Sequence, residues 1–241
     1  QLSISGSGVG ATATVSGGNL WRAAKAEGNI CRIEPTGGGG ACLRPHSCFD
    51  INGEPTCCPS PIVIDIAGNG FNLTSAAGGV RFDINGDEVQ EQIAWTSGNS
   101  DEVWLALDRN GNGTIDSGRE LFGNFTPQPE LPAGEQKNGF RALAVYDKAG
   151  NGGNNDGQID SRDAIFTSLK LWQDRNHNGI SEANELKNLS NSDVRIIELD
   201  YHESRRQDEH GNWFRYRAKV KDIYGAQVGR WAWDVFLQVI R

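Results

Sequence analysis

Oxygen-bearing side chains recur at a regular spacing in residues 174–185. Aspartate stands at position 1, asparagine at positions 3 and 5, glycine at position 6 and glutamate at position 12. An EF-hand loop supplies about six to eight oxygens to calcium at this spacing, including a main-chain carbonyl at position 7. Glycine permits the sharp turn within such a loop. The sequence therefore predicts a calcium site with the ligands Asp174, Asn176, Asn178, Ile180 and Glu185.

Residues 108–120 follow the same spacing with one departure. Position 12 is Arg119, and the acid arrives one residue later as Glu120. Asn-Gly pairs also form tight turns that need no metal, but the repeated acids and amides favour calcium, with Glu120 reaching in after a small adjustment. The predicted ligands are Asp108, Asn110, Asn112, Thr114, Asp116 and Glu120.

A third run, residues 154–163, lacks an oxygen ligand at its start. With Gly157 at position 6, position 1 falls on Gly152, which has no side-chain oxygen. Either Asp147 reaches across an inserted segment, or the site is incomplete. The other predicted ligands are Asn154, Asp156, Gln158, Asp160 and Asp163.

Two shorter runs give weaker signals. The first has Asp83, Asn85 and Asp87 but neither the full loop length nor a final acid, so a plain hairpin turn is an almost equal alternative. In the second, residues 65–70, Ala67 occupies a ligand position. Together the runs predict that the protein binds two to four calcium ions.

The distribution of charge supports metal binding in the same region. Residues 61–200 hold 22 acidic against 11 basic side chains, residues 1–60 hold 4 against 4, and residues 201–241 hold 5 against 8. Without a cation the gathered carboxylates repel one another, so we expect calcium binding to contribute to the folding free energy. A net charge of −8 without a basic run also argues against nucleic-acid binding.

Short strands and helices would position these loops. The apolar pattern predicts helices beside the three longer loops and strands elsewhere, which makes residues 61–241 an α+β domain. The predicted helices are residues 139–146, 162–169 and 182–189. The predicted strands are residues 62–66, 80–83, 92–95, 103–107, 194–201, 213–220 and 229–239.

Two residue types that often carry function have simpler roles here. His177, at position 4 of its loop, is expected to face solvent, since that position points outward in EF-hand loops. Several tryptophans lie in apolar, strand-like runs and are expected in the core rather than at a sugar-binding surface. They are Trp104, Trp172, Trp231 and Trp233.

Five cysteines within 28 residues mark a separate segment, residues 21–60. Zinc sites usually place cysteines about two to four residues apart, and these are spaced differently, so we expect disulfide bonds in an oxidising compartment. Two bridges leave one cysteine over, and the sequence does not fix the pairing. The cysteines are Cys31, Cys42, Cys48, Cys57 and Cys58.

Export agrees with the rest of the composition. The chain has no methionine and no apolar run long enough to span a membrane. It starts at Gln1 without a signal sequence, so we expect a mature product that is secreted or displayed at a cell surface.

Residues 1–20 have no charged side chain and an apolar period of two. Such a segment is ordinarily a disordered tail. If it is ordered, it must pair with a sheet edge on its own domain or on a neighbouring copy, and addition to a neighbour builds a head-to-tail fibre. The residues predicted to enter the neighbour's sheet are Leu2, Ile4, Val9, Ala11, Ala13 and Val15.

Seven segments downstream of residue 60 follow the order of a known family. They are PIVIDIAGNGF (61–71), VRFDINGD (80–87), LALDRNGNGTIDSGRELFG (105–123), NGFRALAVYD (138–147), NDGQIDSRDAIF (155–166), LKLWQDRNHNGISEANEL (169–186) and WDVFL (233–237). In these segments the chain resembles the calcium-dependent self-processing module of iron-regulated RTX (FrpC-like) proteins of Gram-negative bacteria. The resemblance implies bacterial export, calcium-induced folding through the loops named above, and cleavage of an Asp-Pro bond whose new aspartyl end is joined to a lysine.

The chain departs from this family at the cleaved bond. None of its eight prolines follows an aspartate, and it has no HExxH or GxSxG motif, so we predict that it is not an enzyme. The sequence predicts instead a secreted, calcium-stabilised structural protein that assembles with copies of itself into an extracellular filament. The alternatives are a self-processing or transpeptidase-like module and a calcium-dependent adhesin with a carbohydrate ligand.

Overall fold

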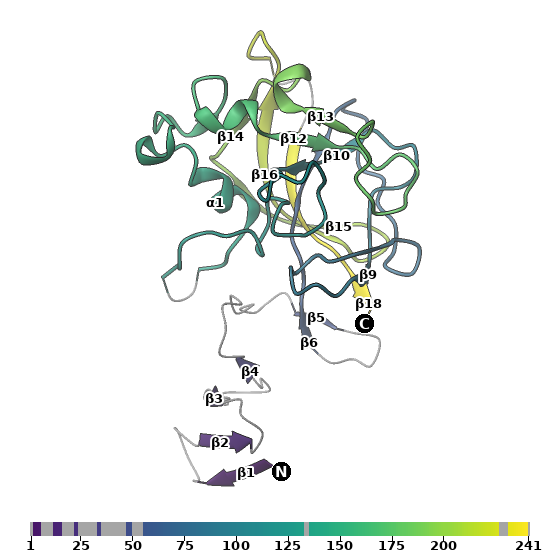
Figure 1. Ribbon diagram of the computed structural model, residues 1–241. Helices are drawn as coiled ribbons and strands as arrows, with labels where there is room; N and C mark the ends of the chain where they lie inside the picture. Colours follow the sequence, from purple (N-terminus) through teal and green to yellow (C-terminus); the bar gives the residue numbers. More distant parts are fainter. Residues whose placement is uncertain are drawn as a thin grey trace. The chain divides into compact units, whose positions relative to one another are not determined.

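The computed structural model describes residues 58–132, 135–226 and 231–240 in full, and the backbone of six short strands before residue 58 (Figure 1). The chain divides into two compact units, residues 1–41 and residues 42–241. In the first unit, β1 (Leu2–Ser5) pairs antiparallel with β2 (Thr12–Val15), and β3 (Arg22–Ala23) with β4 (Ile33–Glu34). In the second, β5 (Ser47–Phe49) pairs with β6 (Pro55–Cys57).

An antiparallel sheet of nine strands forms the centre of the second unit. Its strands are β7 (Ile62–Asp65), β10 (Glu102–Ala106), β11 (Gln158–Ile159), β12 (Lys170–Trp172), β13 (Leu186–Asn188), β14 (Ile196–Glu198), β15 (His202–Gln207), β16 (Trp213–Lys221) and β17 (Trp231–Phe236). Their spatial order is β11-β14-β16-β17-β7-β10-β12-β13, with β15 paired to β16 outside this path. A smaller sheet has the order β18-β9-β8, and its strands are β8 (Val80–Phe82), β9 (Glu91–Ile93) and β18 (Val239–Ile240).

The central strands are buried on both faces, which explains their nearly continuous apolar sequences. Every residue of β7 and β10 is buried. Successive side chains of a strand point to opposite faces, so β10 sends Val103 and Leu105 into one hydrophobic cluster and Trp104 and Ala106 into the other. The sheet therefore separates two cores.

One of these cores is strongly aromatic. We call Phe82, Trp95, Trp104 and Trp172 the tryptophan cluster. Its three indole rings are fully buried, and the ring centroid of Trp95 lies 4.6 Å from that of Trp104 and 5.3 Å from that of Trp172. Trp233 is also buried, and Trp231 packs against the same core. The prediction that these tryptophans are core residues is confirmed.

Helix is scarce, and the α+β prediction is wrong. In the described residues α1 (Gly139–Ala144) is the single α-helix. The remaining helical segments are 3-10 turns: η1 (Ala149–Asn151), η2 (Ala164–Thr167) and η3 (Leu189–Asn191). The predicted helix at 139–146 is thus present in shortened form, capped by the Asn138 side chain, which accepts a 2.9 Å hydrogen bond from the Arg141 N–H.

The other two predicted helices are replaced by different structures. Residues 162–169 contain only the turn η2, and residues 182–189 contain strand β13. Segments this short are marginal as isolated helices, and the β12 edge offers backbone pairing instead, with Trp172 opposite Leu186. Strands therefore flank this loop where an EF-hand would have helices.

The predicted strands are confirmed in position, with boundaries shifted by a few residues. They correspond to β7, β8, β9, β10, β14, β16, β17 and β18. Strand β15 was missed because its sequence, His-Glu-Ser-Arg-Arg-Gln, has no apolar alternation and is almost entirely exposed.

Candidate functional site

Four acidic loops surround or extend from the sheet. We name them loop A (residues 83–91), loop B (108–120), loop C (147–163) and loop D (174–185). Loop A joins β8 to β9, loop B follows β10, loop C follows α1, and loop D joins β12 to β13.

Loops B and D are closed at their bases by sheet-like pairing. Ala106 bridges Leu121 across loop B, and the Leu107 N–H donates to the Glu120 carbonyl at 2.8 Å. In loop D the Gln173 N–H donates to the Glu185 carbonyl at 3.0 Å. Each loop is therefore held as the tip of a hairpin.

The first acid of each of these loops organises the loop backbone. The Asp108 carboxylate accepts N–H groups of Gly111 (2.7 Å) and Gly113 (2.9 Å). Asp174 likewise accepts N–H groups of Asn178 (3.1 Å) and Gly179 (2.9 Å). Gly179 has a φ of 70°, a left-handed conformation that glycine adopts without strain.

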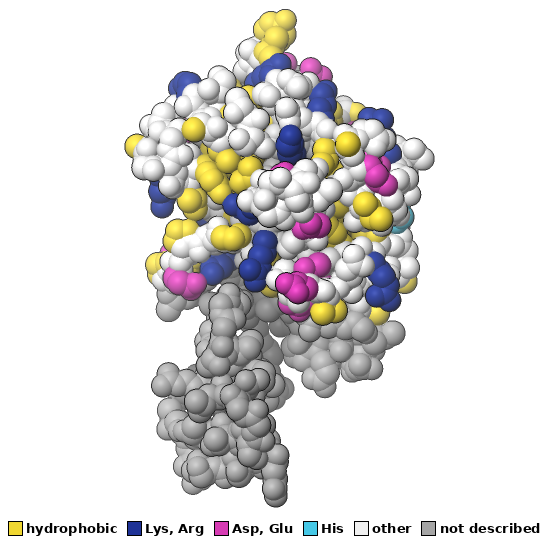
Figure 2. Space-filling view, in the orientation of Figure 1, with side chains coloured by type: hydrophobic (Ala, Val, Ile, Leu, Met, Phe, Trp, Pro, Cys, Tyr) yellow, Lys and Arg dark blue, Asp and Glu magenta, His cyan; other side chains and the backbone are white. Residues whose placement is uncertain are grey.

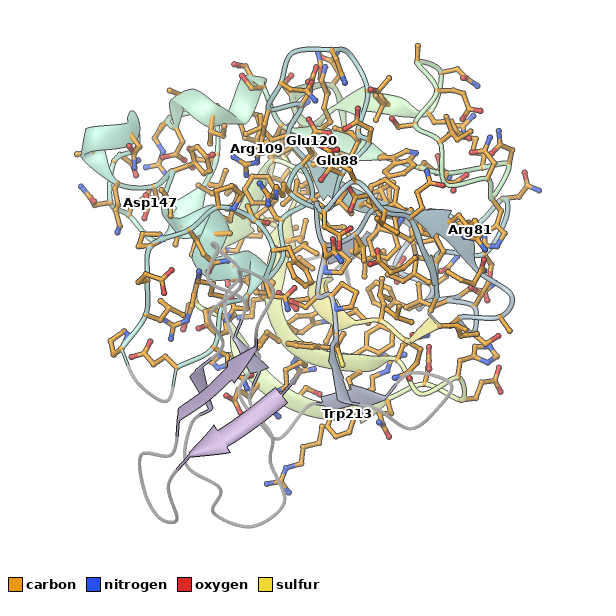
Figure 3. All side chains as sticks on the ribbon, turned by 60° about the horizontal axis from the view of Figure 1, so that its bottom comes forward. Arg81, Glu88, Arg109, Glu120, Asp147 and Trp213 are labelled. Carbon is orange, nitrogen blue, oxygen red and sulfur yellow. The ribbon has the colours of Figure 1, made fainter. Side chains whose placement is uncertain are left out.

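The last acid closes each loop from the other side. Glu185 accepts the Arg175 N–H at 2.8 Å, and Glu120 accepts the equivalent Arg109 N–H at 3.0 Å. Glu120 therefore holds the same place in loop B as Glu185 in loop D, in spite of its extra residue. Figure 3 shows Glu120 beside Arg109, with Asp147 of loop C away from both.

The amides that were predicted as ligands hold a further acid in each loop. The Asn112 side-chain amide donates to Asp116 at 2.7 Å. In loop D the amides of Asn176 and Asn178 donate to Glu182 at 3.1 and 2.8 Å. Glu182, at position 9, was missed by the sequence reasoning, although position 9 is a known EF-hand ligand position.

Burial, together with a neighbouring carboxylate, raises the pKa of the closing acids. Burial raises the pKa of Glu120, and the neighbouring Asp116 adds to this. Burial also raises the pKa of Glu185, with Glu182 as its acidic neighbour. One oxygen of Glu185 and one of Glu182 have no hydrogen-bond partner among the described residues. Acids that are buried, adjacent and incompletely bonded are stabilised by a cation.

Loop C begins at Asp147, which reaches the loop backbone across the inserted segment. The Asp147 carboxylate accepts the N–H groups of Asp156 (3.1 Å) and Gly157 (3.0 Å), the same positions that Asp174 bonds in loop D. The intervening residues form the turn η1. At the other end Asp163 accepts the Asp160 N–H at 2.8 Å, and its second oxygen has no partner among the described residues.

Loop C contains a cation of its own. The Arg162 guanidinium bonds Asp160 at 2.5 Å and also contacts Asp156. This arginine lowers the pKa of Asp160. By contrast, burial raises the pKa of Asp163, and Asp160 and Asp147 add to the effect.

Loop A is a shortened version of the same arrangement. Asp83 accepts the N–H groups of Gly86 (2.8 Å) and Glu88 (3.0 Å), and the Asn85 amide donates to both Asp87 and Glu91. Glu91 also accepts the Ile84 N–H at 3.4 Å, as the closing acids of loops B and D do at position 2. Sequence reasoning missed Glu91 because it lies nine rather than twelve positions along the loop.

The weak run at residues 65–70 is completed by a distant acid. Asp65 accepts the N–H groups of Gly68 and Gly70, both at 2.7 Å. Asp101 accepts the Ala67 N–H at 2.8 Å and the Asn69 amide at 2.9 Å. The carboxylate of Asp101, the residue directly before β10, therefore lies beside Ala67, which has no side-chain oxygen of its own.

The sequence predicted that His177 faces solvent, but in the structure both of its ring nitrogens contact main-chain carbonyls. Its two ring nitrogens lie 2.7 Å from the Thr96 carbonyl and 2.8 Å from the Gly78 carbonyl. The side chain therefore ties loop D to the chain around β8 and β9.

The oxygen donors of these loops suit a hard cation, but in this structure the carboxylates accept hydrogen bonds from main-chain N–H groups. Among the described residues no three acidic, histidine or cysteine side chains converge into a complete metal site. The potential donors are carboxylate, amide and main-chain oxygens, which calcium prefers over softer metals. Loops B and D, each with a buried closing acid beside a second acid, would hold the ion, and calcium would there supply the missing positive charge.

Most of the predicted disulfide and assembly residues lie outside the fully described residues. Cys58 is buried and disulfide-bonded. The residues outside are Cys31, Cys42, Cys48, Cys57, Leu2, Ile4, Val9, Ala11, Ala13 and Val15. The pairing of the cysteines and the role of the N-terminal segment stay predictions.

The visible surface offers no broad apolar patch. On the face shown in Figure 2, hydrophobic side chains form small groups between charged ones. The most exposed large hydrophobic residues in the described ranges are Val89, Ile180, Ile223 and Tyr224. No helix within those ranges is long and apolar enough to cross a membrane.

Comparison with known proteins places the chain in a family. The SPM domain model matches residues 62–237. The chain is 37% identical over 155 residues to the iron-regulated protein FrpA of Neisseria meningitidis serogroup C, an alignment that covers 63% of this chain and 13% of that relative. The chain thus spans only a small part of the relative's length. Its matched region includes all four acidic loops, and the chain belongs to the SPM domain family.

Proposed function

We propose that this chain is a calcium-stabilised structural part of a bacterial RTX-type protein, secreted or held at the cell surface. The observation that carries the proposal is the pair of closing acids, Glu120 and Glu185. Each is buried beside a second acid and receives main-chain hydrogen bonds in the same way. The similarity to an iron-regulated protein supports the RTX assignment.

Calcium would act on folding rather than on a substrate. Loops B and D cover the core that contains the tryptophan cluster, since Ile115 of loop B and Leu186 after loop D pack in it. Carboxylates that repel each other in these loops oppose closure of that core. An ion bound only by the folded form adds its binding free energy to the stability of the fold.

Removal of calcium tests this proposal directly. The full chain in calcium should melt cooperatively at a higher temperature than in EDTA, and tryptophan emission should shift to the red when the ion is removed. Magnesium should not restore the calcium values, because it requires a smaller, octahedral site. Identical melting curves and emission in calcium, magnesium and EDTA would reject the proposal.

A second candidate, peptide-bond processing, is favoured by the surroundings of Ser60 and Pro61. The chain here is held on two sides: Val235 N–H donates to the Pro61 carbonyl at 3.1 Å, and Asn124 accepts the Ser60 N–H at 3.0 Å. Ser60 lies beside the carboxyl of Asp234, which is fully buried and has one oxygen without a hydrogen-bond partner among the described residues. A Ser-Pro bond next to a buried acid therefore directly precedes the family-matched residues.

The substitution Ser60→Asp tests this candidate by creating an Asp-Pro bond. The introduced carboxylate would attack its own carbonyl carbon and form a cyclic anhydride, while the Pro61 nitrogen leaves with a proton from Asp234. We expect calcium-dependent fragments that end at residue 60 and begin at residue 61. The double variant Ser60→Asp, Asp234→Asn should cleave more slowly. An intact Ser60→Asp chain in calcium would count against processing at this position.

A further inference from the structure

Loops B and D meet at their eighth residues, Ile115 and Ser181. The Ser181 hydroxyl accepts the Ile115 N–H at 2.6 Å and lies 3.2 Å from the Ile115 carbonyl, to which it donates. Both residues are buried, with exposed fractions of 3% for Ser181 and 1% for Ile115. One hydroxyl therefore satisfies both main-chain groups of a residue 66 positions away.

The sheet explains why the two loops meet. β10 and β12 are antiparallel neighbours, with Trp104 opposite Trp172. Loop B leaves from one end of this pair and loop D from the other. Because Ile115 packs in the same core as both tryptophans, the loops must fold back over one face of the sheet to make their contact. They meet over the tryptophan cluster.

Other contacts extend this arrangement to loop A and the small sheet. Asp83 at the start of loop A bridges Ser117 of loop B, and the Gly118 N–H donates to the Asp83 carbonyl at 2.7 Å. Gly179 of loop D packs so closely on β8 that an added Cβ would lie 2.8 Å from the Arg81 carbonyl. Loops A, B and D, with β8 and β9, thus form a continuous rim.

We propose that loops B and D bind calcium as one cooperative pair, with Ser181 as the positioning residue that couples them. This inference rests on the calcium binding proposed above. Position 8 lies directly between positions 7 and 9, both ligand positions of an EF-hand loop, so an ion in one loop fixes the residue that contacts the other loop. The second ion then meets a loop that is already ordered, which raises its affinity.

Calcium titration of the full chain, followed by calorimetry and tryptophan emission, tests the coupling. The wild type should bind calcium in loops B and D with a Hill coefficient above one. Ser181→Ala should still bind both ions, but with a Hill coefficient near one and an affinity for the second ion lowered by about 5- to 150-fold. Ser181→Thr keeps the hydroxyl and should retain the coupling.

Ser192→Ala is the matched control. Ser192 is also buried, and its hydroxyl donates to the Leu189 carbonyl at 2.7 Å and accepts the Val194 N–H at 3.1 Å, outside all four loops. This variant should bind calcium as cooperatively as the wild type. Unchanged cooperativity in Ser181→Ala, or an equal loss in Ser192→Ala, would overturn the inference. A wild type that binds both ions independently would also overturn it, whereas one that binds no calcium would reject the proposed function itself.

Discussion

Loop C and the loops of the rim share one arrangement of acids but differ in how the negative charge is balanced. In loop C the Arg162 guanidinium bonds two of the acids. In loops B and D the acids beside Glu120 and Glu185 receive only amide and main-chain donors in the described residues. In loop C a side chain of the protein therefore supplies the positive charge. We propose that an ion from solution supplies it in loops B and D.

The negative charge of one more buried acid, Asp234, is balanced in a different way. Asp234 on β17 is fully buried, accepts a hydrogen bond from the Gly139 N–H, and has one oxygen without a partner among the described residues. Burial raises the pKa of Asp234 to about 8. Its charge is removed by protonation, with neither an arginine nor an ion. The arginine in loop C, the proposed ion in loops B and D and the protonation of Asp234 should make these acids respond differently to mutation, calcium and pH.

The largest difference should appear between the closing acids of loops D and C. Glu185→Gln and Asp163→Asn each replace one carboxylate by an amide of equal size. An ion present at about 100 to 1,000 times its dissociation constant contributes about 2.7–4.1 kcal/mol to stability. In saturating calcium, Glu185→Gln should therefore lower the melting temperature by roughly 6–15 °C and shift tryptophan emission to the red.

Asp163→Asn serves as the comparison for that measurement. Loop C lies away from the tryptophan cluster and keeps its arginine, so this variant should lower the melting temperature by less than half as much and leave the emission unchanged. Equal shifts in melting temperature in the two variants would show that loop D does not depend on calcium more than loop C does.

The pH dependence of stability should separate Asp234 from the calcium loops. A carboxyl has a pKa of about 4 in the unfolded chain, and that of Asp234 in the folded chain is about 8. Because the folded pKa is the higher one, the stabilisation is complete below about pH 4 and is lost as pH rises toward 8. The loss amounts to at most about 1.4 kcal/mol per pH unit.

Asp234→Asn removes this titration while keeping the shape of the side chain. The difference in unfolding free energy between the wild type and this variant, measured in urea at saturating calcium from pH 5 to 9, should change in favour of the variant until about pH 8 and then level off. A difference that does not vary with pH would contradict a protonated Asp234.

The sequence allowed loops B and D to be located because their acids and amides are contiguous and regularly spaced, whereas their role as calcium ligands stays a prediction. The acids that complete loops A and C were harder to assign. Glu91 closes a shortened loop, and Asp147 acts across an insertion, so both depart from the spacing that identifies the pattern. Ser181 gave no signal, since its role depends on β10 and β12 being neighbours in the sheet.

The flanking helices were predicted for a related reason. An EF-hand loop implies helices on both sides, and Leu186 and Leu189 are compatible with a helical period. In the structure Leu186 packs against the core with the tryptophan cluster and Leu189 enters the opposite core. The short strand β13 and the turn η3 that follows it therefore place the two leucines against different cores.

A smaller effect is expected from removing the internal cation of loop C. The Arg162 side chain is 57% exposed, and ion pairs at exposed side chains contribute little to stability because water and salt screen them. Arg162→Gln should therefore leave the melting temperature in EDTA nearly unchanged. It should raise the calcium affinity of loop C by at most about fivefold, because the ion no longer competes with the guanidinium.

Calorimetric titration at low calcium concentration measures this affinity. Arg175→Gln, which changes an arginine of loop D that bonds Gln173 rather than an acid, is the matched control and should have no such effect. If Arg162→Gln weakens calcium binding, the arginine supports the loop instead of competing with the ion.

The smallest effect on stability should come from the N-terminal segment. Residues 1–41 form a unit separate from residues 42–241, so deletion of residues 1–18 should leave the calcium-dependent melting temperature unchanged. We propose that this segment assembles the chain with a second copy. Its backbone forms the hairpin β1–β2, with Leu2 opposite Val15 and Ile4 opposite Ala13, and strand addition to the sheet of another copy is the mode of assembly that we expect.

Sedimentation of the full chain and of the deletion variant, with and without calcium, tests this assembly. The full chain should form head-to-tail oligomers in calcium, the deletion variant should stay monomeric, and Ile4→Asp should weaken association without changing the melting temperature. Each buried isoleucine or valine contributes about 1.5–3 kcal/mol to such a contact, so one aspartate should lower the association constant by at least tenfold. A full chain that stays monomeric at high concentration in calcium would remove the basis for a filament, and a deletion that lowers the melting temperature would show that the hairpin packs on its own chain.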